Sequence, residues 1–299
     1  MEKEHLFIVI AATFYGTITV GGQFLANLGL SLYEIAILPI SVISIPMSLI
    51  VMFKREFLIS RGVLRFFIVY GLIGGILHVT QFGGIVLGVP VAVVVLLLYT
   101  QPIWTTILGK ILLQETITKS KSLAVVLAFI GVFVLLKPWD IESIGNLSGI
   151  FSALVAGVFL SLWVIWGRRS GINKQHYVTT TFGFTIFSTM WLWLLLPISS
   201  LFVQASWARI SLNFSTYQWC YIILFGLLWG TVSHALFYSG MKRVPASTAG
   251  IILLLEPVSA TVLATIIFRQ AVTMNVIVGG VLILISNCVV LLKSRLEKN

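Results

Sequence analysis

The amino-acid sequence predicts an all-α integral membrane protein, with ten transmembrane helices arranged as two inverted five-helix repeats. Three observations support this fold class: the composition, a series of ten apolar segments, and an internal repeat. Of the 299 residues, 59% are hydrophobic and 9% are charged, and the mean hydropathy is +1.07. Ordinary globular domains carry about 25% charged residues. We therefore expect most side chains to face lipid or another helix.

Ten apolar segments follow one another along the chain, and each is close to the roughly 20 residues that one helical crossing needs. They cover residues 6–26, 31–52, 64–86, 90–113, 119–137, 145–167, 177–198, 217–240, 246–268 and 272–292. The third and fourth segments are separated only by a short break before Pro90, and the eighth and ninth by one before Pro245. Proline is well accommodated in the first turn of a helix. We therefore treat each pair as two spans. The first segment has no convincing small-residue cleavage site, so we expect a retained span and not a signal peptide.

The distribution of basic residues predicts the side of the membrane on which the termini lie. With ten spans, both termini share one side. Placing them inside assigns sixteen of the nineteen Lys and Arg residues to the cytoplasm and leaves Lys137, Arg209 and Arg269 outside. Cytoplasmic loops carry an excess of Lys and Arg. The sequence thus predicts a multi-pass protein of the cell (plasma or inner) membrane with cytoplasmic termini. Because the net charge of +10 is spread over short clusters, a nucleic-acid partner is not expected.

An internal repeat relates the two halves of the chain. A shift of 155 positions aligns residues 70–118 with 225–273 without a gap, and twelve of the 49 pairs are identical. The informative matches are Gly71 with Gly226, Gly75 with Gly230, Val89 and Pro90 with Val244 and Pro245, and Pro102 with Pro257. The halves, 1–140 and 141–299, then hold five spans each, so the second half enters the membrane from the opposite side. Inverted repeats of this kind are typical of solute carriers. A duplicated scaffold that no longer transports is the alternative.

Glu256 is the sharpest candidate for a chemical role. It lies about ten residues, or roughly 15 Å, inside its span. A carboxylate at that depth is costly unless it is protonated, paired or facing water. It could bind a cationic group of a solute or a coupling proton, or it could be hydrogen-bonded at a helix kink and serve the fold. The next residue, Pro257, cannot donate to the Leu253 carbonyl, which predicts a kink and a free carbonyl. Its counterpart in the first half is the uncharged Gln101, beside Pro102.

Two histidines also fall inside spans, His78 in the third and His234 in the eighth. Either could relay protons near neutral pH, or each could be a hydrogen-bonded packing residue. Helical spacing places Tyr238 on the same face as His234, and Gln81 on a face near His78. These four side chains are candidates for a site inside the membrane.

Aromatic side chains are frequent in the same spans. Tyr15, Tyr99, Trp163 and Trp229 could form an aromatic box around an apolar or cationic solute, or such rings could anchor helices at the interface. The candidate substrate-binding residues are therefore Tyr15, His78, Gln81, Tyr99, Gln101, Trp163, Trp229, His234, Tyr238 and Glu256. No catalytic residue, metal ligand or cofactor is expected.

Three segments of the chain resemble the drug/metabolite transporter superfamily, EamA type. They are FYGTITVGGQ at 14–23, GVPVAVVVLLLYTQPIWTTILGKILLQETIT at 88–118, and RVPASTAGIILLLEPVSATVLATIIF at 243–268. The resemblance implies ten helices with cytoplasmic termini and a cavity lined mainly by spans one to four and six to nine. Members mostly export amino acids, related metabolites or drugs, and some import. The chain departs from the family pattern at Pro39, near the Arg of many members, and at Gln270, where a Glu often follows the ninth span; Glu115 keeps that Glu in the first half.

Together these observations predict a secondary transporter, which exports a small organic metabolite, an amino acid or a related amphiphilic solute, by alternating access. A lipid scramblase and a non-transporting membrane enzyme or scaffold are the alternatives. An enzyme is not expected, because the acids near the membrane surface are scattered and no metal or nucleophile spacing occurs. The expected partners are the solute and membrane lipid, with a coupling proton as an option. The sequence leaves substrate identity, direction, coupling ion and oligomeric state open.

Overall fold

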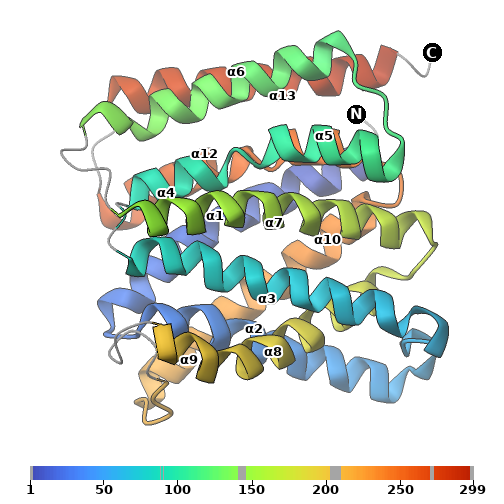
Figure 1. Cartoon of the computed structure of the whole chain (residues 1–299), viewed down its shortest axis with the longest axis vertical. Coiled ribbons are helices and arrows are strands. Elements are labelled where there is room, and N and C mark those ends of the chain that lie inside the picture. Colours follow the sequence, from blue (N-terminus) through green and yellow to red (C-terminus); the bar gives the residue numbers. More distant parts are fainter. Residues whose placement is uncertain are drawn as a thin grey trace.

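The fold is a bundle of long helices that run side by side across the molecule (Figure 1). The computed structural model describes residues 3–87, 89, 91–140, 146–202, 210–269 and 273–296. Every regular element in these ranges is a helix. Ten of the described segments are long and apolar enough to cross a membrane. The predicted all-α fold with ten spans is therefore confirmed.

Seven of the spans are single helices. They are α1 (Lys3–Asn27), α2 (Leu32–Phe53), α3 (Leu64–Val86), α6 (Lys119–Leu136), α7 (Leu147–Ile172), α8 (Tyr177–Phe202) and α13 (Met274–Leu296). Short 3-10 turns, Arg55–Phe57, Arg61–Val63 and Pro138–Asp140, lie in the connections. The start of α2 is set by a capping box, because Ser31 and Glu34 satisfy each other's backbone N–H groups.

The other three spans are interrupted. The fourth consists of α4 (Val91–Leu98) and α5 (Gln101–Leu113), and the ninth of α11 (Ala246–Ile252) and α12 (Leu255–Phe268). The eighth consists of α9 (Thr216–Gly226), a π-helical segment (Leu227–Val232) and α10 (Ser233–Gly240). The π-helical segment was not anticipated from the sequence.

Proline explains the breaks in the fourth and ninth spans. Pro102 and Pro257 each lie in the first turn after the break and cannot continue the backbone hydrogen-bond ladder. The kink predicted at Pro257 is thus a full break, and the fourth span has a similar break before Pro102. The prediction of a free Leu253 carbonyl is wrong, since this oxygen accepts a hydrogen bond of 2.9 Å from the Glu256 N–H. The chain tightens into a turn and satisfies the group locally.

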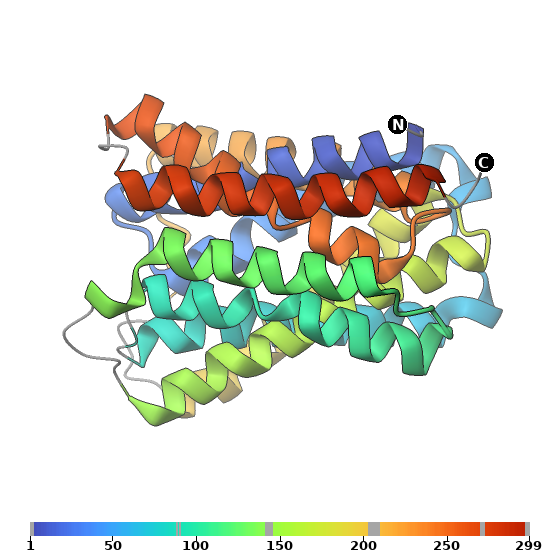
Figure 2. The same cartoon turned by 90° about the horizontal axis from the view of Figure 1, so that it is seen from above.

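The helix boundaries repeat along the chain with the spacing of the sequence repeat. α4 and α11 begin 155 residues apart, as do α6 and α13, and α5 and α12 end with the same separation. The residues that end α5 and α12, Gln114 and Arg269, both have left-handed backbones with φ of 56° and 53°. Figure 2 shows α6 and α13 running in opposite directions along each other. These features support the predicted inverted repeat, while its division at residue 140 stays a prediction.

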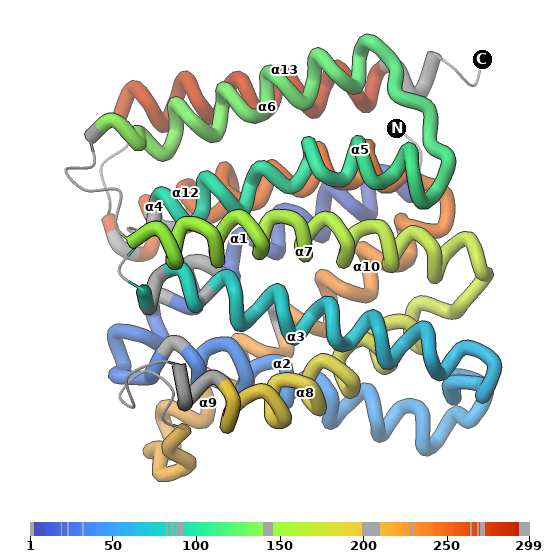
Figure 3. Tube along the Cα trace, viewed as in Figure 1, coloured from blue at the N-terminus to red at the C-terminus, as the bar shows by residue number. Residues whose placement is uncertain are grey.

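The helices are arranged in layers, with a central group of helices between two outer groups. α6 and α13 pack together along one edge, α2, α8 and α9 lie toward the other, and α1, α3, α7 and α10 run between them (Figures 1 and 3). Both termini lie at the same end of the bundle, as ten crossings require. The largest cluster of buried apolar side chains is formed by the central helices together with α2 and α8. The assignment of the terminal end to the cytoplasm stays a prediction.

Candidate functional site

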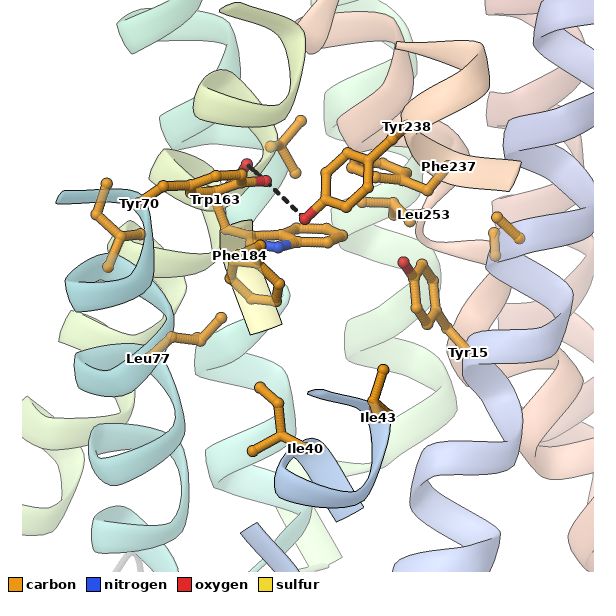
Figure 4. Packing of buried hydrophobic residues seen from close by; sticks show 14 of the residues in the cluster. Tyr15, Ile40, Ile43, Tyr70, Leu77, Trp163, Phe184, Phe237, Tyr238 and Leu253 are labelled. Atoms are coloured by element: carbon orange, nitrogen blue, oxygen red, sulfur yellow. Dashed lines mark hydrogen bonds between the residues drawn. The ribbon is translucent and has the colours of Figure 1, made fainter. Parts of the chain in front are cut away.

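Seven buried rings meet in the middle of the bundle, and we refer to them as the aromatic cluster. They are Tyr15 of α1, Tyr70 of α3, Trp163 of α7, Phe184 of α8, and His234, Phe237 and Tyr238 of α10. None of these side chains is more than 5% exposed. Figure 4 shows that Tyr15, Tyr70, Phe184 and Tyr238 surround the indole of Trp163. The cluster therefore joins helices from both halves of the chain.

The rings pack in the two geometries that aromatic quadrupoles favour. The Trp163 indole is stacked on Phe237, with centroids 4.4 Å apart and an interplanar angle of 12°. His234 is stacked on Phe184 at 5.5 Å. Tyr15 stands edge-on to both stacks, with its ring centroid 6.0 Å from Trp163 and 5.5 Å from His234. One ring from the first helix thus packs against a group of rings from the second half.

The hydroxyl of Tyr70 ties the cluster to the backbone. It lies 3.0 Å from the Trp163 carbonyl oxygen and 2.9 Å from the Tyr238 hydroxyl. A carbonyl can only accept, so the single Tyr70 proton goes to Trp163 and Tyr238 donates to Tyr70. These two bonds hold α3, α7 and α10 together at the level of the cluster.

The hydroxyl of Tyr15 is different, because it is buried and has no hydrogen-bond partner in the described part of the chain. In Figure 4 it points toward Tyr238 and the middle of the cluster. A buried polar group without a partner costs about 1–3 kcal/mol. Such a group in a native fold needs an explanation. We therefore consider the Tyr15 oxygen in the proposed function below.

Glu256 lies beside the aromatic cluster, in the first turn of α12. The Tyr99 phenol, at the break between α4 and α5, is within hydrogen-bonding reach of its carboxyl group. Tyr15 is close enough to interact with it electrostatically. Leu254 and Tyr99 share one small apolar cluster, so the two helix breaks meet near this carboxyl. The position at a helix N-terminus also favours negative charge.

Two other carboxylates serve the helix ends. Glu115 accepts hydrogen bonds from the backbone N–H groups of Ala246 (2.5 Å) and Ser247 (3.0 Å) and from the Ser247 hydroxyl (2.6 Å), and so caps α11. Glu34 accepts from the N–H groups of Ser31 (2.7 Å) and Ser211 (2.6 Å). The hydrogen bonds of both acids to backbone N–H groups explain why a carboxylate lies at each position. Glu256 caps no helix in this way, which sets it apart from these two acids of the described chain.

Tyr15, Trp163, His234 and Tyr238 belong to the aromatic cluster, and Tyr99 and Glu256 lie beside it. Gln101 is not among these candidates. Its side-chain amide donates to the Thr105 hydroxyl in the same helix and packs against Gly250 of α11. It is 1% exposed and lies outside the aromatic cluster. The amide thus serves the contact between α5 and α11, and the expectation that it shares a site with Glu256 has no direct contact to support it.

The remaining candidates differ in how closely they approach the cluster. His78 of α3 is half-buried and interacts electrostatically with His234. Gln81 is half-buried nearly one turn further along α3. Trp229 belongs to the π-helical segment, and its side chain lies outside the described residues. The binding roles of all three stay predictions.

Sequence reasoning missed three members of the aromatic cluster: Tyr70, Phe184 and Phe237. Phe237 carried a signal, because it matches Phe82 in the internal repeat. Tyr70 and Phe184 carried none that separates them from the many other rings in the spans. Among the described residues, no group of three or more His, Cys, Asp or Glu side chains could hold a metal ion.

Comparisons with known proteins agree with the fold. The model of the EamA-like transporter family matches residues 2–137 and 147–292. An uncharacterized transporter of Clostridium kluyveri is 25% identical over 297 residues, which cover 97% of this chain and 93% of the relative. An uncharacterized transporter of Archaeoglobus fulgidus is 27% identical over 192 residues, or 64% of each chain. A crystal structure of a protein with 17% identity has a TM-score of 0.80 and covers 97% of this chain and 99% of that one, so the fold is shared. The chain is a multi-pass membrane protein and belongs to the EamA-like transporter family.

Proposed function

We propose that this protein is a secondary transporter that exports a small organic metabolite, an amino acid or a related amphiphilic solute, by alternating access. The aromatic cluster and Glu256 form the binding site. One observation supports the proposal: the buried Tyr15 hydroxyl has no hydrogen-bond partner among the described residues and lies near both the rings of the second half and the Glu256 carboxyl. A site for a solute with an apolar body and a polar group needs these components.

The arrangement of helices suits a carrier that opens alternately to the two sides. α1 and α3 of the first half contribute Tyr15 and Tyr70, and helices of the second half contribute the other five rings. A small rotation of one half against the other changes the distances between these two rings and the other five. Rocking of two repeats around a fixed central site is the motion that inverted-repeat carriers use. A solute that contacts both halves can then be carried between the two states.

The ends of the bundle hold contacts that such a motion has to release. At the end where the termini lie, Glu115 caps α11 and Arg243 pairs with Glu4 at 3.1 Å. At the opposite end, Glu34 binds the Ser211 N–H. We propose that the terminal end faces the cytoplasm, in line with the distribution of basic residues. We also propose that the membrane is the cell membrane.

The test is solute exchange by the purified full chain in proteoliposomes. A thermal-shift screen against amino acids, amines and nucleobases selects ligands, because a ligand that binds the native state raises its apparent stability. Each selected ligand is then tested for exchange across the vesicle membrane. We expect at least one to exchange, and Trp163→Ala to reduce its rate at least tenfold.

A matched control lies on the same helix. Phe151 of α7 is 70% exposed, whereas Trp163 is 5% exposed. Phe151→Ala is expected to keep the exchange rate. Failure of the folded protein to exchange any ligand of the panel contradicts the proposal. Movement of labelled phospholipid between leaflets without solute exchange would favour a scramblase in its place.

A further inference from the structure

We infer that the π-helical segment Leu227–Val232 is a conformational switch of the carrier: it becomes α-helical in the opposite-facing state, and α9 rotates against α2 as it does so. The inference rests on the proposed function and adds the local change by which the eighth span takes part in alternating access. It follows from a comparison of this segment with its copy in the first half.

The two copies have the same length but different backbones. Leu72–Leu77 of α3 aligns with Leu227–Val232 without a gap, and Gly75 matches Gly230 inside the aligned stretch. The first copy is part of one continuous α-helix, whereas the second is π-helical. A π-helical turn is closed by hydrogen bonds between residues i and i+5 and therefore holds more residues than an α-helical turn. Because the alignment needs no inserted residue, the length of the eighth span is compatible with an α-helix as well.

The copies also occupy equivalent places between the two halves. α3 packs on α8, and the eighth span packs on α2, so each contacts the second helix of the opposite half. A β-carbon at Gly75 would lie 3.1 Å from the Trp191 β-carbon of α8, and one at Gly230 would clash with the Ile43 side chain of α2. Both contacts therefore join one half to the other. One is made by a straight α-helix and the other by the π-helical segment.

A local difference between inverted copies marks a change between the two facing states. Turning an inverted-repeat carrier about its pseudo-twofold axis converts a state that is open to one side into a state that is open to the other. The two copies exchange their conformations in this operation. In the exchanged arrangement, the eighth span has the continuous α-helix that α3 has in this structure.

Two buried hydroxyls show what the π-helical form lacks. Thr231 Oγ1 and Ser233 Oγ are buried and have no hydrogen-bond partner in the described part of the chain. A Ser or Thr hydroxyl inside an α-helix can donate to the carbonyl oxygen four residues earlier. Thr80 of α3 and Ser239 of α10 make this bond, both at 2.7 Å. An α-helical segment offers the same bond to Thr231 and Ser233, so the α-helical form is accessible to this sequence.

The conversion links the aromatic cluster to the contact between the halves. α10, which follows the segment, carries three rings of the cluster and lies in the central group of helices, whereas α9 lies with α2 in an outer group (Figure 1). One residue corresponds to about 100° of rotation in an α-helix. When the wide turn closes, α9 rotates by about that angle relative to α10. Gly226, whose β-carbon position is 2.9 Å from the Pro39 carbonyl oxygen, then leaves this contact with α2.

The first test compares two deletions at matched positions of the repeat. Deletion of Leu227, whose side chain is 38% exposed, closes the wide turn and leaves α9 and α10 in their present register. The switch is then fixed, so we expect the purified full chain to keep its unfolding temperature and to exchange solute at least tenfold more slowly in proteoliposomes. Deletion of Leu72, the matching residue of α3, shifts the register of an α-helix that has no wide turn and should lower the unfolding temperature. Exchange at the original rate without Leu227, or an equal loss of stability in both variants, overturns the inference.

The second test observes the rotation without a solute. Cys220 of α9 and Cys288 of α13 are exposed and can carry nitroxide labels. Pulsed electron paramagnetic resonance then measures the distance between the labels in proteoliposomes. Gly230→Ala favours the α-helical form, because alanine stabilises an α-helix relative to glycine and its β-carbon clashes with Ile43 in the π-helical form. We expect Gly230→Ala to shift the distance distribution, and deletion of Leu227 to leave a single distance.

A glycine of α1 provides the control for the second test. A β-carbon at Gly22 would meet its nearest atom, Cγ2 of Ile35, at 3.7 Å, which is an ordinary contact. Gly22→Ala should therefore leave the distance distribution unchanged. The same distribution in Gly230→Ala as in the unmodified chain overturns the switch, while solute exchange by the unmodified chain still supports transport. Absence of exchange for the whole panel contradicts the proposed function itself.

Discussion

The two broken spans, α4–α5 and α11–α12, share their geometry and differ in their chemistry. Both begin and end at equivalent positions, their breaks differ by one residue, and a proline follows each break. In the middle, the first copy has Gln101 and the second has Glu256. After the last helix of each copy, the first has Glu115 and the second has Gln270. The shape of the span is thus set by the repeated prolines, and the positions of the charges are set by single residues that differ between the copies.

This difference gives the two residues unlike surroundings. The Gln101 amide N–H group donates to the Thr105 hydroxyl of the same helix and packs against Gly250, while the Gln101 side-chain oxygen is buried without a partner in the described chain. Glu256 is approached by Tyr99 and Tyr15, which belong to other helices. A twofold pattern in the sequence therefore does not give the two positions the same neighbours. One copy has a packing residue where the other has a half-buried acid.

The largest expected effect comes from exchanging the two central residues. Glu256→Gln should reduce solute exchange at least tenfold, and adding Gln101→Glu should not restore it, because a carboxylate at 101 faces Thr105 and Gly250 and not the aromatic cluster. Exchange rates in proteoliposomes measure both variants, with unfolding temperatures as a check on folding. Recovery by the double variant to half of the original rate or more would show that the copies are functionally equivalent.

A second comparison uses the fifth and tenth spans, which pack on each other. A β-carbon at Gly279 of α13 would lie 2.6 Å from the Gly131 carbonyl oxygen of α6, whereas one at the adjacent Gly280 would meet its nearest atom at 4.0 Å. Overpacking of this kind costs about 1–3 kcal/mol. Gly279→Ala should therefore lower the free energy of unfolding by about that amount, measured by denaturant titration in detergent. Gly280→Ala should be neutral or slightly stabilising, and equal losses in both variants would contradict the close contact.

The cap that Glu115 provides for α11 gives a smaller expected change in stability. Glu115→Gln keeps one acceptor oxygen for the start of α11 but removes the charge that favours a helix N-terminus. We expect a loss of about 1 kcal/mol in the free energy of unfolding. The exposed Glu56→Gln serves as the control for loss of one negative charge. An unchanged stability for Glu115→Gln would mean that the three hydrogen bonds to Ala246 and Ser247 do not depend on the carboxylate.

The smallest effect concerns pH and the connection between α7 and α8. His176 is stacked on Phe57 at 4.5 Å. Partial burial and the positive charge of Lys242 lower the pKa of His176 below its ordinary value, and Glu56 partly offsets this. Protonation is then favoured in the unfolded chain, so this contribution to stability is present above about pH 6.5 and is lost as pH falls below it.

The matching connection in the first half, residues 28–31, has no titratable side chain. We therefore expect the unfolding temperature of the unmodified protein to fall slightly more between pH 7.5 and 5.5 than that of His176→Gln. Identical pH dependence in the two proteins would contradict the role of His176.

Much of the fold could be predicted because lipid imposes a simple rule on the chain. A crossing needs a certain length of apolar helix, and this marks all ten spans in the sequence. Pro257, which lacks a backbone N–H, predicted a kink in the ninth span, while Pro39, Pro46 and Pro197 lie inside unbroken helices. No residue in the sequence indicated the π-helical segment Leu227–Val232. It depends on how the eighth span packs against its neighbours and not on a residue that forbids an α-helix.

The sequence by itself determined the number of spans, the repeat and the depth of Glu256, because these depend on composition, spacing and helix rise along one chain. Only the tertiary structure decided which rings meet. Tyr70, Phe184 and Phe237 join Trp163 because α3, α8 and α10 bring one face of each helix to the same point, and a ring on any other face would meet lipid or another layer. The tertiary structure also separated Gln101 from Glu256, since the partners of a buried polar group are set by neighbouring helices that the local sequence does not specify.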